Sequence, residues 1–345
     1  MSAAQSRWYD LPEIDWETLF HPSFDYRYFR QPLVLPLAAE DICPSDVCTP
    51  LTAAWAADAA MLAYGGIGTN RMDLLDFDEL LDSVQMRGHR IGNWSPDAKS
   101  VKAFFAYNQR FAMLAFRGTK RINWINSTVD LAAFLAHEHP ETDPDRAEFT
   151  ADQAGHSEVA PGSDKVLVHA GFQFALNTLW EDISFCLGSY RKKYPFCPIL
   201  FTGHSLGAAF ATMSAARFRG GKAALYTYGS PRVGNAAFCK QVHRNADLGV
   251  FRFVNNRDLM TSVPPRDKSY EHTCGLMQIG PEGTIVPACE TEDRPSAGMA
   301  QVLHNAAAVL RDYMSKEPPP PDLVDHAQRR YCYYIWRWAR SGQVP

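Results

Sequence analysis

The sequence predicts an α/β protein with a mostly parallel central sheet and helices on both faces. The run at 165–172 predicts a strand that leads into a helix over 172–194, and residues 198–218 predict a strand, a tight turn and a helix. The runs at 222–229 and 249–256 predict further short strands. Continuous apolar strands that alternate with helices are typical of a parallel sheet buried on both faces. Because this alternation runs on without a domain linker, we expect residues 1–345 to form a single domain.

Composition excludes several classes of protein. The chain has 345 residues with 34 Lys+Arg and 38 Asp+Glu, a net charge of −4, which argues against a basic nucleic-acid binder. No run approaches about 18 consecutive apolar residues, so we expect no transmembrane segment. Eight cysteines are too sparse over this length for a disulfide scaffold. The composition is that of an ordinary globular protein.

The first 48 residues predict an irregular arm packed on the body of the protein. Six prolines and many aromatic residues interrupt any long helix there. The first 20 residues mix acidic with apolar side chains and show no basic region followed by an apolar run, so no ordinary secretory signal is visible. The sequence therefore leaves the location open between the cytoplasm and export by a signal-independent route.

Local signals predict the next elements in order. Thr49 and Pro50 start a helix that runs through strong helix formers to Gly65, and a second helix covers 72–84. Residues 101–107 and 110–116 predict a hairpin, although Asn108-Gln109 lacks the glycine that the tightest turns favour. The polar stretch from 118 to about 164 predicts a functional loop or lid, since long structureless segments are rarely filler.

The segment Gly203-His204-Ser205-Leu206-Gly207 carries the strongest functional signal. It is a GxSxG motif that follows an apolar strand and precedes an Ala-rich helix. A sharp strand-to-helix turn needs residues without side chains at 203 and 207, and it lifts Ser205 to the carboxyl edge of the sheet. The helix N-terminus directs backbone N–H groups at any oxyanion that forms there. Ser205 is therefore the candidate nucleophile, against the alternative of a helix-capping serine in a glycine turn.

A nucleophilic serine needs a histidine to take its proton and a carboxylate to orient that histidine. In a strand–turn–helix context of this kind the chain order is serine, acid, histidine. Asp258 directly follows an apolar strand and is the preferred acid, although Asn255, Asn256 and Asp258 could simply form a turn. Asp247 and Asp267 are weaker candidates because neither follows a strand so directly.

Three histidines are candidates for the base. His326 lies immediately before an amphipathic helix, where a loop entering the last helix is expected, and we favour it over His272. His304 is a distant third. A packing role is the commoner fate of any one histidine, so this preference depends on the serine and the acid.

Several segments in order resemble the class 3 lipases, an α/β-hydrolase group that includes the fungal triacylglycerol lipases. The resemblance covers roughly residues 49–338 and is carried by FRGTKRINWI (116–125), VHAGF (168–172), FTGHSLGAA (201–209), YGSPRVGNAAF (228–238), FVNNRDLMTSVPP (253–265) and DHAQRRY (325–331). It implies an α/β-hydrolase fold with a lid segment after the oxyanion loop. It also implies that Ser205, Asp258 and His326 form a catalytic triad, and that His272 lies on a non-catalytic segment.

The resemblance further implies an oxyanion hole and a lid. Thr119, which follows the Arg-Gly of the FRG motif, and Leu206, which follows the serine, would supply the two backbone donors. The lid would start after Thr119, with Trp124 and Ile125 among its apolar, substrate-facing residues and with lid and insertion together covering about 120–160. The alternative for 121–136 is a fixed surface helix whose apolar face belongs to the core. Residues 138–158 form an acidic insertion without a counterpart in the family pattern.

The implied function is hydrolysis of carboxylic esters through an acyl-enzyme, most specifically by a triacylglycerol lipase. Phospholipase A1 and feruloyl-type esterase are alternatives because the same triad serves all three. Outside the enzymes, the alternative is a catalytically silent hydrolase-fold protein that binds lipid. We expect no metal and no organic cofactor. The expected partners are an ester lipid and, transiently, a lipid interface, with no nucleic acid and no transmembrane segment.

The last helix allows two interpretations. Tyr331, Tyr334, Ile335 and Trp338 share one face, whereas Arg330, Arg337 and Arg340 lie on another. A helix on a membrane surface has this pattern. So does a terminal helix docked on the sheet with its basic face in water, which is the interpretation we favour.

Overall fold

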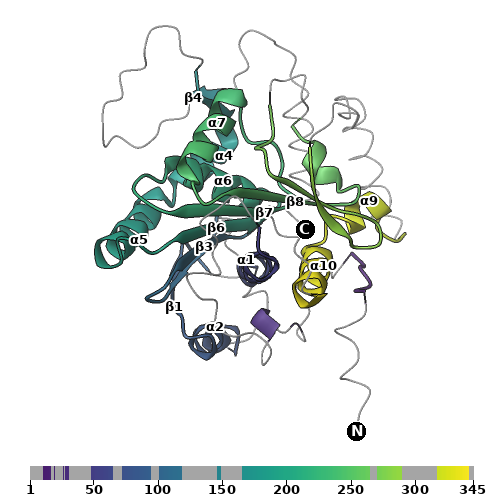
Figure 1. Ribbon diagram of the computed structural model, residues 1–345, viewed down its shortest axis with the longest axis horizontal. Helices are drawn as coiled ribbons and strands as arrows, with labels where there is room; N and C mark the ends of the chain where they lie inside the picture. The colour runs from purple at the N-terminus through teal and green to yellow at the C-terminus, as the bar shows by residue number, and fades with distance from the viewer. Residues whose placement is uncertain are drawn as a thin grey trace.

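An eight-stranded sheet forms the centre of the protein (Figure 1). We describe the protein from a computed structural model that covers residues 11–16, 19, 26, 28–30, 48–64, 72–94, 101–118, 146–148, 165–264, 270–289 and 317–341. In spatial order the strands are β1 (Arg87–Ile91), β2 (Ala103–Tyr107), β3 (Ala112–Phe116), β6 (Ile199–His204), β7 (Ala223–Tyr228), β8 (Val250–Asn255), β9 (Leu276–Ile279) and β10 (Ile285–Ala288). The strands from β3 to β9 run parallel, and both edges are antiparallel.

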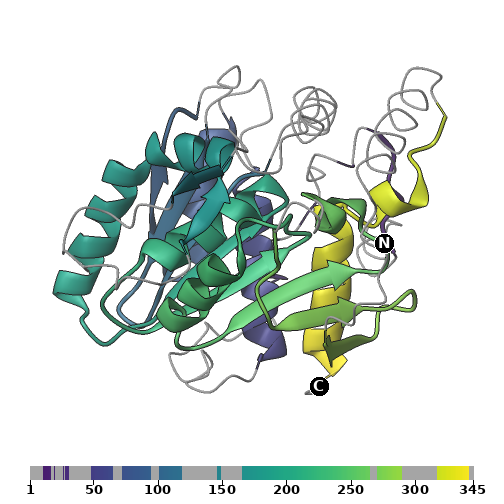
Figure 2. The same ribbon diagram turned by 90° about the horizontal axis from the view of Figure 1, so that it is seen from above.

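Helices cover both faces of this sheet, which confirms the predicted fold class. One face carries α1 (Pro50–Leu62), α2 (Met72–Ser83) and α10 (Gln328–Ser341); the other carries α4 (Ala170–Asn177), α5 (Trp180–Lys193), α6 (Leu206–Arg217) and α7 (Ala236–Asn245). Each set of helices encloses its own apolar core against the sheet. Viewed from above, the second set lies over the sheet, and α1 and α10 lie beyond it (Figure 2).

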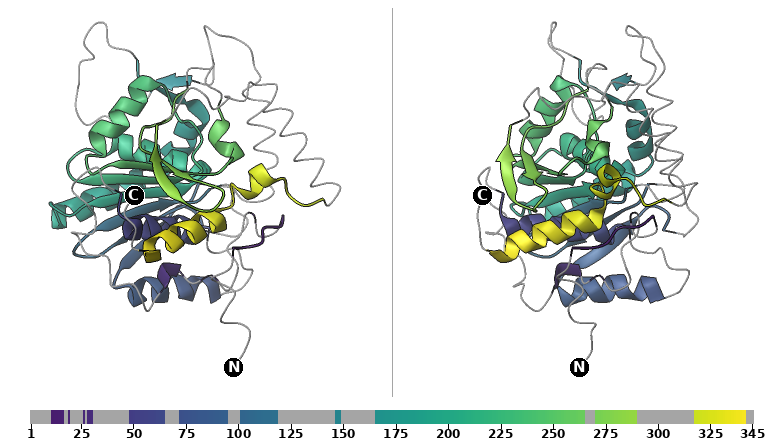
Figure 3. Two further views of the ribbon diagram at one scale, coloured as in Figure 1. Left: turned by 45° about the vertical axis from the view of Figure 1, so that its right-hand side comes forward. Right: turned by 90° about the vertical axis from the view of Figure 1, so that its right-hand side faces the viewer.

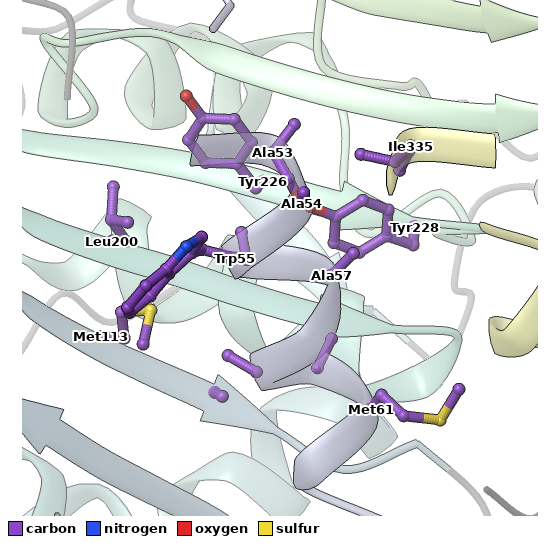
Figure 4. Close-up of a cluster of buried hydrophobic side chains, with 14 of the residues drawn as sticks. Ala53, Ala54, Trp55, Ala57, Met61, Met113, Leu200, Tyr226, Tyr228 and Ile335 are labelled. Carbon is purple, nitrogen blue, oxygen red and sulfur yellow. Dashed lines mark hydrogen bonds between the residues drawn. The ribbon is translucent and has the colours of Figure 1, made fainter. Parts of the chain in front are cut away.

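The α1 helix is the centre of the first core. The Thr49 hydroxyl accepts the N–H of Thr52 at 3.3 Å and so caps the predicted helix start. Every residue from Thr52 to Leu62 is buried, because the sheet, α10 and the N-terminal arm surround the helix. Its many alanines lie close to the strands, with Tyr228 and Ile335 beside them (Figure 4). Small side chains therefore allow α1 to approach both the sheet and α10.

The buried carboxylate of Asp58 joins three parts of the chain. It accepts hydrogen bonds from the Tyr26 hydroxyl and the Phe29 N–H, and from Trp336 Nε1 at 2.9 Å. Phe29, in the 3₁₀ turn η1 (Tyr28–Arg30), is fully buried against Trp55. Tyr26 and Phe29 of the arm are thus packed on the body of the protein.

The predicted hairpin is confirmed, and its turn has a local explanation. Strands β2 and β3 pair antiparallel around 108–111. Asn108 Oδ1 accepts the N–H groups of Arg110 and Phe111 at 2.8 and 3.0 Å, so an asparagine side chain closes the turn without a glycine.

Two sequence predictions were wrong around residues 165–194. The run at 165–172 supplies β5 (Leu167–His169), which pairs with β4 (Arg146–Glu148) in a separate two-stranded sheet and not with the main sheet. The helix expected over 172–194 is divided into α4 and α5 at Thr178-Leu179. The Thr178 hydroxyl bonds the carbonyl of Ala175 at 2.7 Å, and this local bond competes with continuation of the helix.

The α10 helix is docked on the body, which confirms the favoured interpretation. It lies beside α1 in several views (Figures 1 and 3). Tyr331, Tyr334, Ile335 and Trp338 are buried, whereas Arg337 and Arg340 are exposed. Among the described helices, none is both long enough and apolar enough to cross a bilayer.

Candidate functional site

The site begins at the turn that carries Ser205. This turn joins the end of β6 to the start of α6, and Ser205 adopts φ 57° and ψ −130°, a strained conformation for a residue with a side chain. A Cβ at Gly203 would lie 2.3 Å from the carbonyl oxygen of Gly207, and one at Gly207 would lie 2.4 Å from that of Phe116. Only glycine at both positions lets strand, turn and helix pack this closely.

The carboxyl ends of four neighbouring parallel strands meet at this turn. The Ser205 N–H donates to the carbonyl of Tyr228, the last residue of β7, at 3.0 Å. A Cβ at Gly118, just after β3, would lie 2.7 Å from the carbonyl oxygen of His204. Asp258 follows β8 and caps the 3₁₀ helix η3 (Leu259–Ser262). Such an edge is where open α/β sheets collect their functional loops.

Asp258 and His326 form a buried pair. His326 Nδ1 lies 2.9 Å from both carboxylate oxygens of Asp258. A carboxylate can only accept, so Nδ1 carries the proton and Nε2 is the unprotonated nitrogen of the neutral ring. Nε2 is buried and has no hydrogen-bond partner among the described residues. The pair therefore presents one proton acceptor inside the site.

Two further groups fix the Asp258 carboxylate. The Met260 N–H donates to Oδ1 at 2.9 Å, and the Tyr331 hydroxyl of α10 donates to Oδ2 at 2.6 Å. Burial and the charge of Asp258 raise the pKa of Tyr331 well above its usual range, so this hydroxyl stays protonated and remains a donor. Gly229 provides the space for the pair, because a Cβ there would lie 2.5 Å from Asp258 Oδ2.

The histidine beside the serine has a structural role. His204 Nε2 lies 2.7 Å from the carbonyl oxygen of His326, which can only accept, so Nε2 donates. Nδ1 then accepts from the Tyr64 hydroxyl at 2.8 Å. Burial, reinforced by the charge of His326, lowers the pKa of His204 well below its usual value. A neutral His204 thus ties the serine turn to the loop of His326.

The alternative acids and bases lie elsewhere or outside the described residues. Nε2 of His272 is hydrogen-bonded to the carbonyl of Thr261 at 2.8 Å, and Asp258 contacts His326 instead. Asp247 accepts the N–H of Ala223, which opens β7, so it lies at the opposite end of the strands. His304 and Asp267 lie outside the described residues.

Only part of the expected oxyanion hole and lid can be placed. Leu206 is the first residue of α6, where a helix leaves its N–H groups without intrahelical partners. Thr119, Trp124 and Ile125 lie outside the described residues. A groove of about 400 Å³ between α5 and the β1–β2 edge is lined by Phe105, Tyr107 and Tyr190 among others, and its lining does not include the triad candidates. Among the described residues, no cluster of His, Cys, Asp or Glu could hold a metal ion.

Sequence reasoning missed the residues that support the pair. Tyr331 appeared only as part of an apolar helix face, and Tyr64 only as the end of a helical run. Their contacts with Asp258 and His204 join positions 73 and 140 residues apart. The DHAQRRY segment was the available signal, because it places Tyr331 five residues beyond His326, in the first turn of the following helix.

A family match accompanies this geometry. Residues 113–268 match the family model described as lipase (class 3). This part of the chain belongs to the class 3 lipases. The class 3 lipase segment includes Ser205 and Asp258, and with them the parallel strands β6 to β8. The serine turn between a central parallel strand and the following helix is that of an α/β hydrolase.

Curated relatives align over part of this chain. A secreted mono- and diacylglycerol lipase of Malassezia restricta is 33% identical over 132 residues, which are 37% of this chain and 44% of the relative. Secreted mono- and diacylglycerol lipase 1 of Fusarium solani is 37% identical over 150 residues, 43% of this chain and 45% of the relative. The chain thus spans less than half of the length of these relatives.

Solved structures show a weaker likeness. Lipase II from Rhizopus niveus is 18% identical, with a TM-score of 0.48 over 74% of this chain and 95% of that one. The native Rhizomucor miehei lipase propeptide complex is 21% identical, with a TM-score of 0.47 over 73% of this chain and 75% of that one.

Proposed function

We propose that this protein is a serine ester hydrolase that cleaves acylglycerols, with Ser205 as nucleophile, His326 as base and Asp258 as the orienting acid. The observation that carries the proposal is the buried Asp258–His326 pair, with its 2.9 Å contacts at Nδ1 and an unprotonated Nε2, on loops at the strand edge where Ser205 lies. The class 3 lipase family of the central segment supports it.

The mechanism follows from the chemistry of these groups. His326 Nε2 takes the hydroxyl proton of Ser205 as the oxygen attacks the ester carbonyl, and the same proton then passes to the leaving alcohol. Asp258 and the Tyr331 hydroxyl hold the imidazole in the tautomer that this step needs. Water repeats the sequence on the acyl-enzyme and releases the fatty acid. No step requires a metal or an organic cofactor.

The Leu206 N–H is the proposed donor to the oxyanion from the helix side, and the Thr119 N–H is proposed as the second. Preorganised donors of this kind stabilise the tetrahedral intermediate, and each contributes ~10²–10³-fold to kcat. Trp124 and Ile125 are proposed to belong to a lid that turns its apolar side to a lipid interface. The whole chain, 1–345, is proposed to act as one domain.

The substrate class is proposed from both the resemblance and the relatives. The resemblance to fungal lipases favours triacylglycerols, whereas the curated relatives are named mono- and diacylglycerol lipases. A panel of mono-, di- and triacylglycerols in emulsion separates the two. Activity confined to phospholipids would favour phospholipase A1, and activity confined to aryl esters a feruloyl-type esterase.

The decisive experiment is Ser205→Ala with p-nitrophenyl ester hydrolysis and fluorophosphonate labelling. Loss of the nucleophile should lower kcat by ~10⁴-fold or more and abolish labelling, with the unfolding midpoint near that of the wild type. Ser262→Ala on η3 is the matched control and should label normally. If the folded wild-type protein neither hydrolysed esters nor reacted with the fluorophosphonate, the proposal would be refuted and a lipid-binding protein without turnover would be favoured.

A further inference from the structure

Two loops meet beneath the Asp258–His326 pair. The acid loop is Asn255–Asp258, which starts at the last residue of β8, and the base loop is Asp325-His326, between α9 (Pro321–Val324) and α10. Asn255 Nδ2 donates to the carbonyl of Asp325 at 2.9 Å. Asn256 Nδ2 and the Arg257 N–H both donate to Asp325 Oδ2, at 2.9 and 3.2 Å. Three consecutive residues of the acid loop therefore bind one residue of the base loop.

We propose that Asp325 is a positioning residue, whose carboxylate holds the acid loop against the base loop and thereby sets the distance between Asp258 and His326. The inference rests on the proposed function, since it concerns how the triad is assembled. Asp325 would act through its neighbours, because Oδ2 is already hydrogen-bonded to Asn256 and Arg257.

The backbone of the acid loop supports this role. Asn256 has φ 43°, in the left-handed region that costs energy for most residues but is tolerated by asparagine when its side chain bonds locally. Its amide meets a carboxylate, and hydrogen bonds to a charged acceptor are roughly twice as strong as neutral ones. The bond to Asp325 thus offsets the cost of the turn that aims Asp258 at His326.

The pKa of Asp325 reflects both its burial and its hydrogen bonds to the acid loop. Burial raises the pKa of Asp325, while the hydrogen bonds from Arg257 and Asn256 and the charge of Arg330 act in the opposite direction. The contacts made by the acid loop therefore stabilise the ionised form that the bonds require. The charge of Asp258 faces the same carboxylate and adds to the rise in its pKa.

The test is a double-mutant cycle on the full chain with Asp325→Ala and Asn256→Gly. Glycine at 256 removes the donor but keeps the left-handed backbone. We expect each variant to lower kcat by ~10–100-fold with KM within twofold, because a displacement of about 1 Å in a catalytic pair costs up to ~10²-fold. The double variant should lose no more than the larger single loss, since both remove the same bond.

Two matched variants separate positioning from general damage. Asp325→Asn keeps an acceptor oxygen and should retain kcat within about fivefold of wild type. Asp322→Ala removes an exposed carboxylate from the adjacent short helix α9 and should leave kcat unchanged. Equal losses in the Asn and Ala variants of Asp325 would overturn the role of the acceptor.

A spectroscopic readout keeps this test independent of turnover. The proton on His326 Nδ1, shared with Asp258, should give a downfield ¹H NMR signal in the wild type, assigned by its loss in His326→Gln. We expect Asp325→Ala to broaden or shift it. An unchanged signal together with an unchanged kcat, or purely additive losses in the cycle, would refute the inference. A wild type that shows the signal but no hydrolysis or labelling would instead refute the proposed function.

Discussion

The two glycines of the serine turn illustrate a residue requirement that can be deduced from sequence. Gly203 lies against the backbone of Gly207, four residues away, and Gly207 lies against Phe116 in the adjacent strand. The GxSxG pattern is therefore sufficient to predict that both positions need glycine. The residues around Asp258 and His326 differ, because Tyr331 and Asp325 act through contacts that only the folded chain brings together. Motif reasoning identified the triad candidates but not the groups that hold them.

Gly207→Ala is expected to damage both stability and activity. Its Cβ would lie 2.4 Å from the carbonyl oxygen of Phe116 and 2.8 Å from the carbonyl carbon of Arg117, and backbone cannot rotate away as a side chain can. We expect a loss of about 1–3 kcal/mol in the free energy of unfolding, measured in urea, and a fall in kcat of at least ~10-fold.

Gly188→Ala is the control for that substitution. A Cβ at Gly188 would meet nothing within 4 Å, and the residue lies inside α5. Alanine there should stabilise the protein by about 0.5–1 kcal/mol and leave kcat unchanged. If Gly207→Ala behaved like Gly188→Ala, close packing at the serine turn would not be the reason for its glycine.

At the scale of elements, prediction succeeded where the signal was local. The cap at Thr49, the β2–β3 hairpin and the strand–turn–helix around Ser205 are all formed by neighbours in sequence. Strand β1 (RGHRI) was missed because it is a half-exposed edge strand with three polar residues. The strands β9 and β10 have four residues each and were not predicted. The wrong assignment of β5 to the main sheet shows that an apolar run predicts a strand but not its partner.

Asp58→Ala should destabilise the assembly of α1, α10 and the arm. It would leave Trp336 Nε1 and the Phe29 N–H without their acceptor in a buried site. Each unsatisfied donor costs about 1–3 kcal/mol, so we expect the free energy of unfolding to fall by about 2–5 kcal/mol. Asp82→Ala, at an exposed position of α2, should change it by less than about 0.5 kcal/mol.

Urea denaturation followed by tryptophan fluorescence measures the free energy of unfolding of both variants. The Asp58→Asn variant keeps one acceptor oxygen, so its loss of stability should lie between those of Asp58→Ala and Asp82→Ala. A loss below about 1 kcal/mol in Asp58→Ala would contradict the view that this carboxylate organises the three segments.

At the scale of the whole molecule, His204 makes stability depend on pH. Its pKa is lowered on folding, so the unfolded chain binds a proton at a pH where the folded protein does not. Stability is therefore lost as the pH falls below about 6.5. Tyr64, His326 and Tyr331 are the titratable groups that face the ring.

Between pH 7 and 5 this single histidine should lower the free energy of unfolding by at most about 1.9 kcal/mol. This limit applies if the ring stays neutral in the folded protein over the whole range while it titrates normally in the unfolded chain. Subtracting the pH profile of His204→Gln from that of the wild type cancels the other titrating groups. A difference that grows as the pH falls is expected, whereas a flat difference would show that the ring binds its proton equally well in the folded and unfolded chain.

The placement of the site within the molecule was the least predictable feature. The strands that carry Ser205 and Asp258 are neighbours of β7, and the sequence order of the motifs was sufficient to expect this. The ring of His326 lies beside the ring of His204, with 4.5 Å between their centroids. This placement depends on how α10 packs against α1. That packing is a property of apolar surfaces that no motif describes.

The contact between α1 and α10 also bears on how the protein is made. Trp336 bonds Asp58 across 278 positions of the chain, so α1 leaves the ribosome long before its neighbour exists. At 5–20 residues per second this delay is about 14–56 s, which is long compared with the collapse of a nascent chain. During that time the almost wholly apolar α1 lacks the surface that covers it. We therefore expect nascent chains to depend on chaperones, and His326, the proposed base, to be the last of the three triad candidates to reach the site.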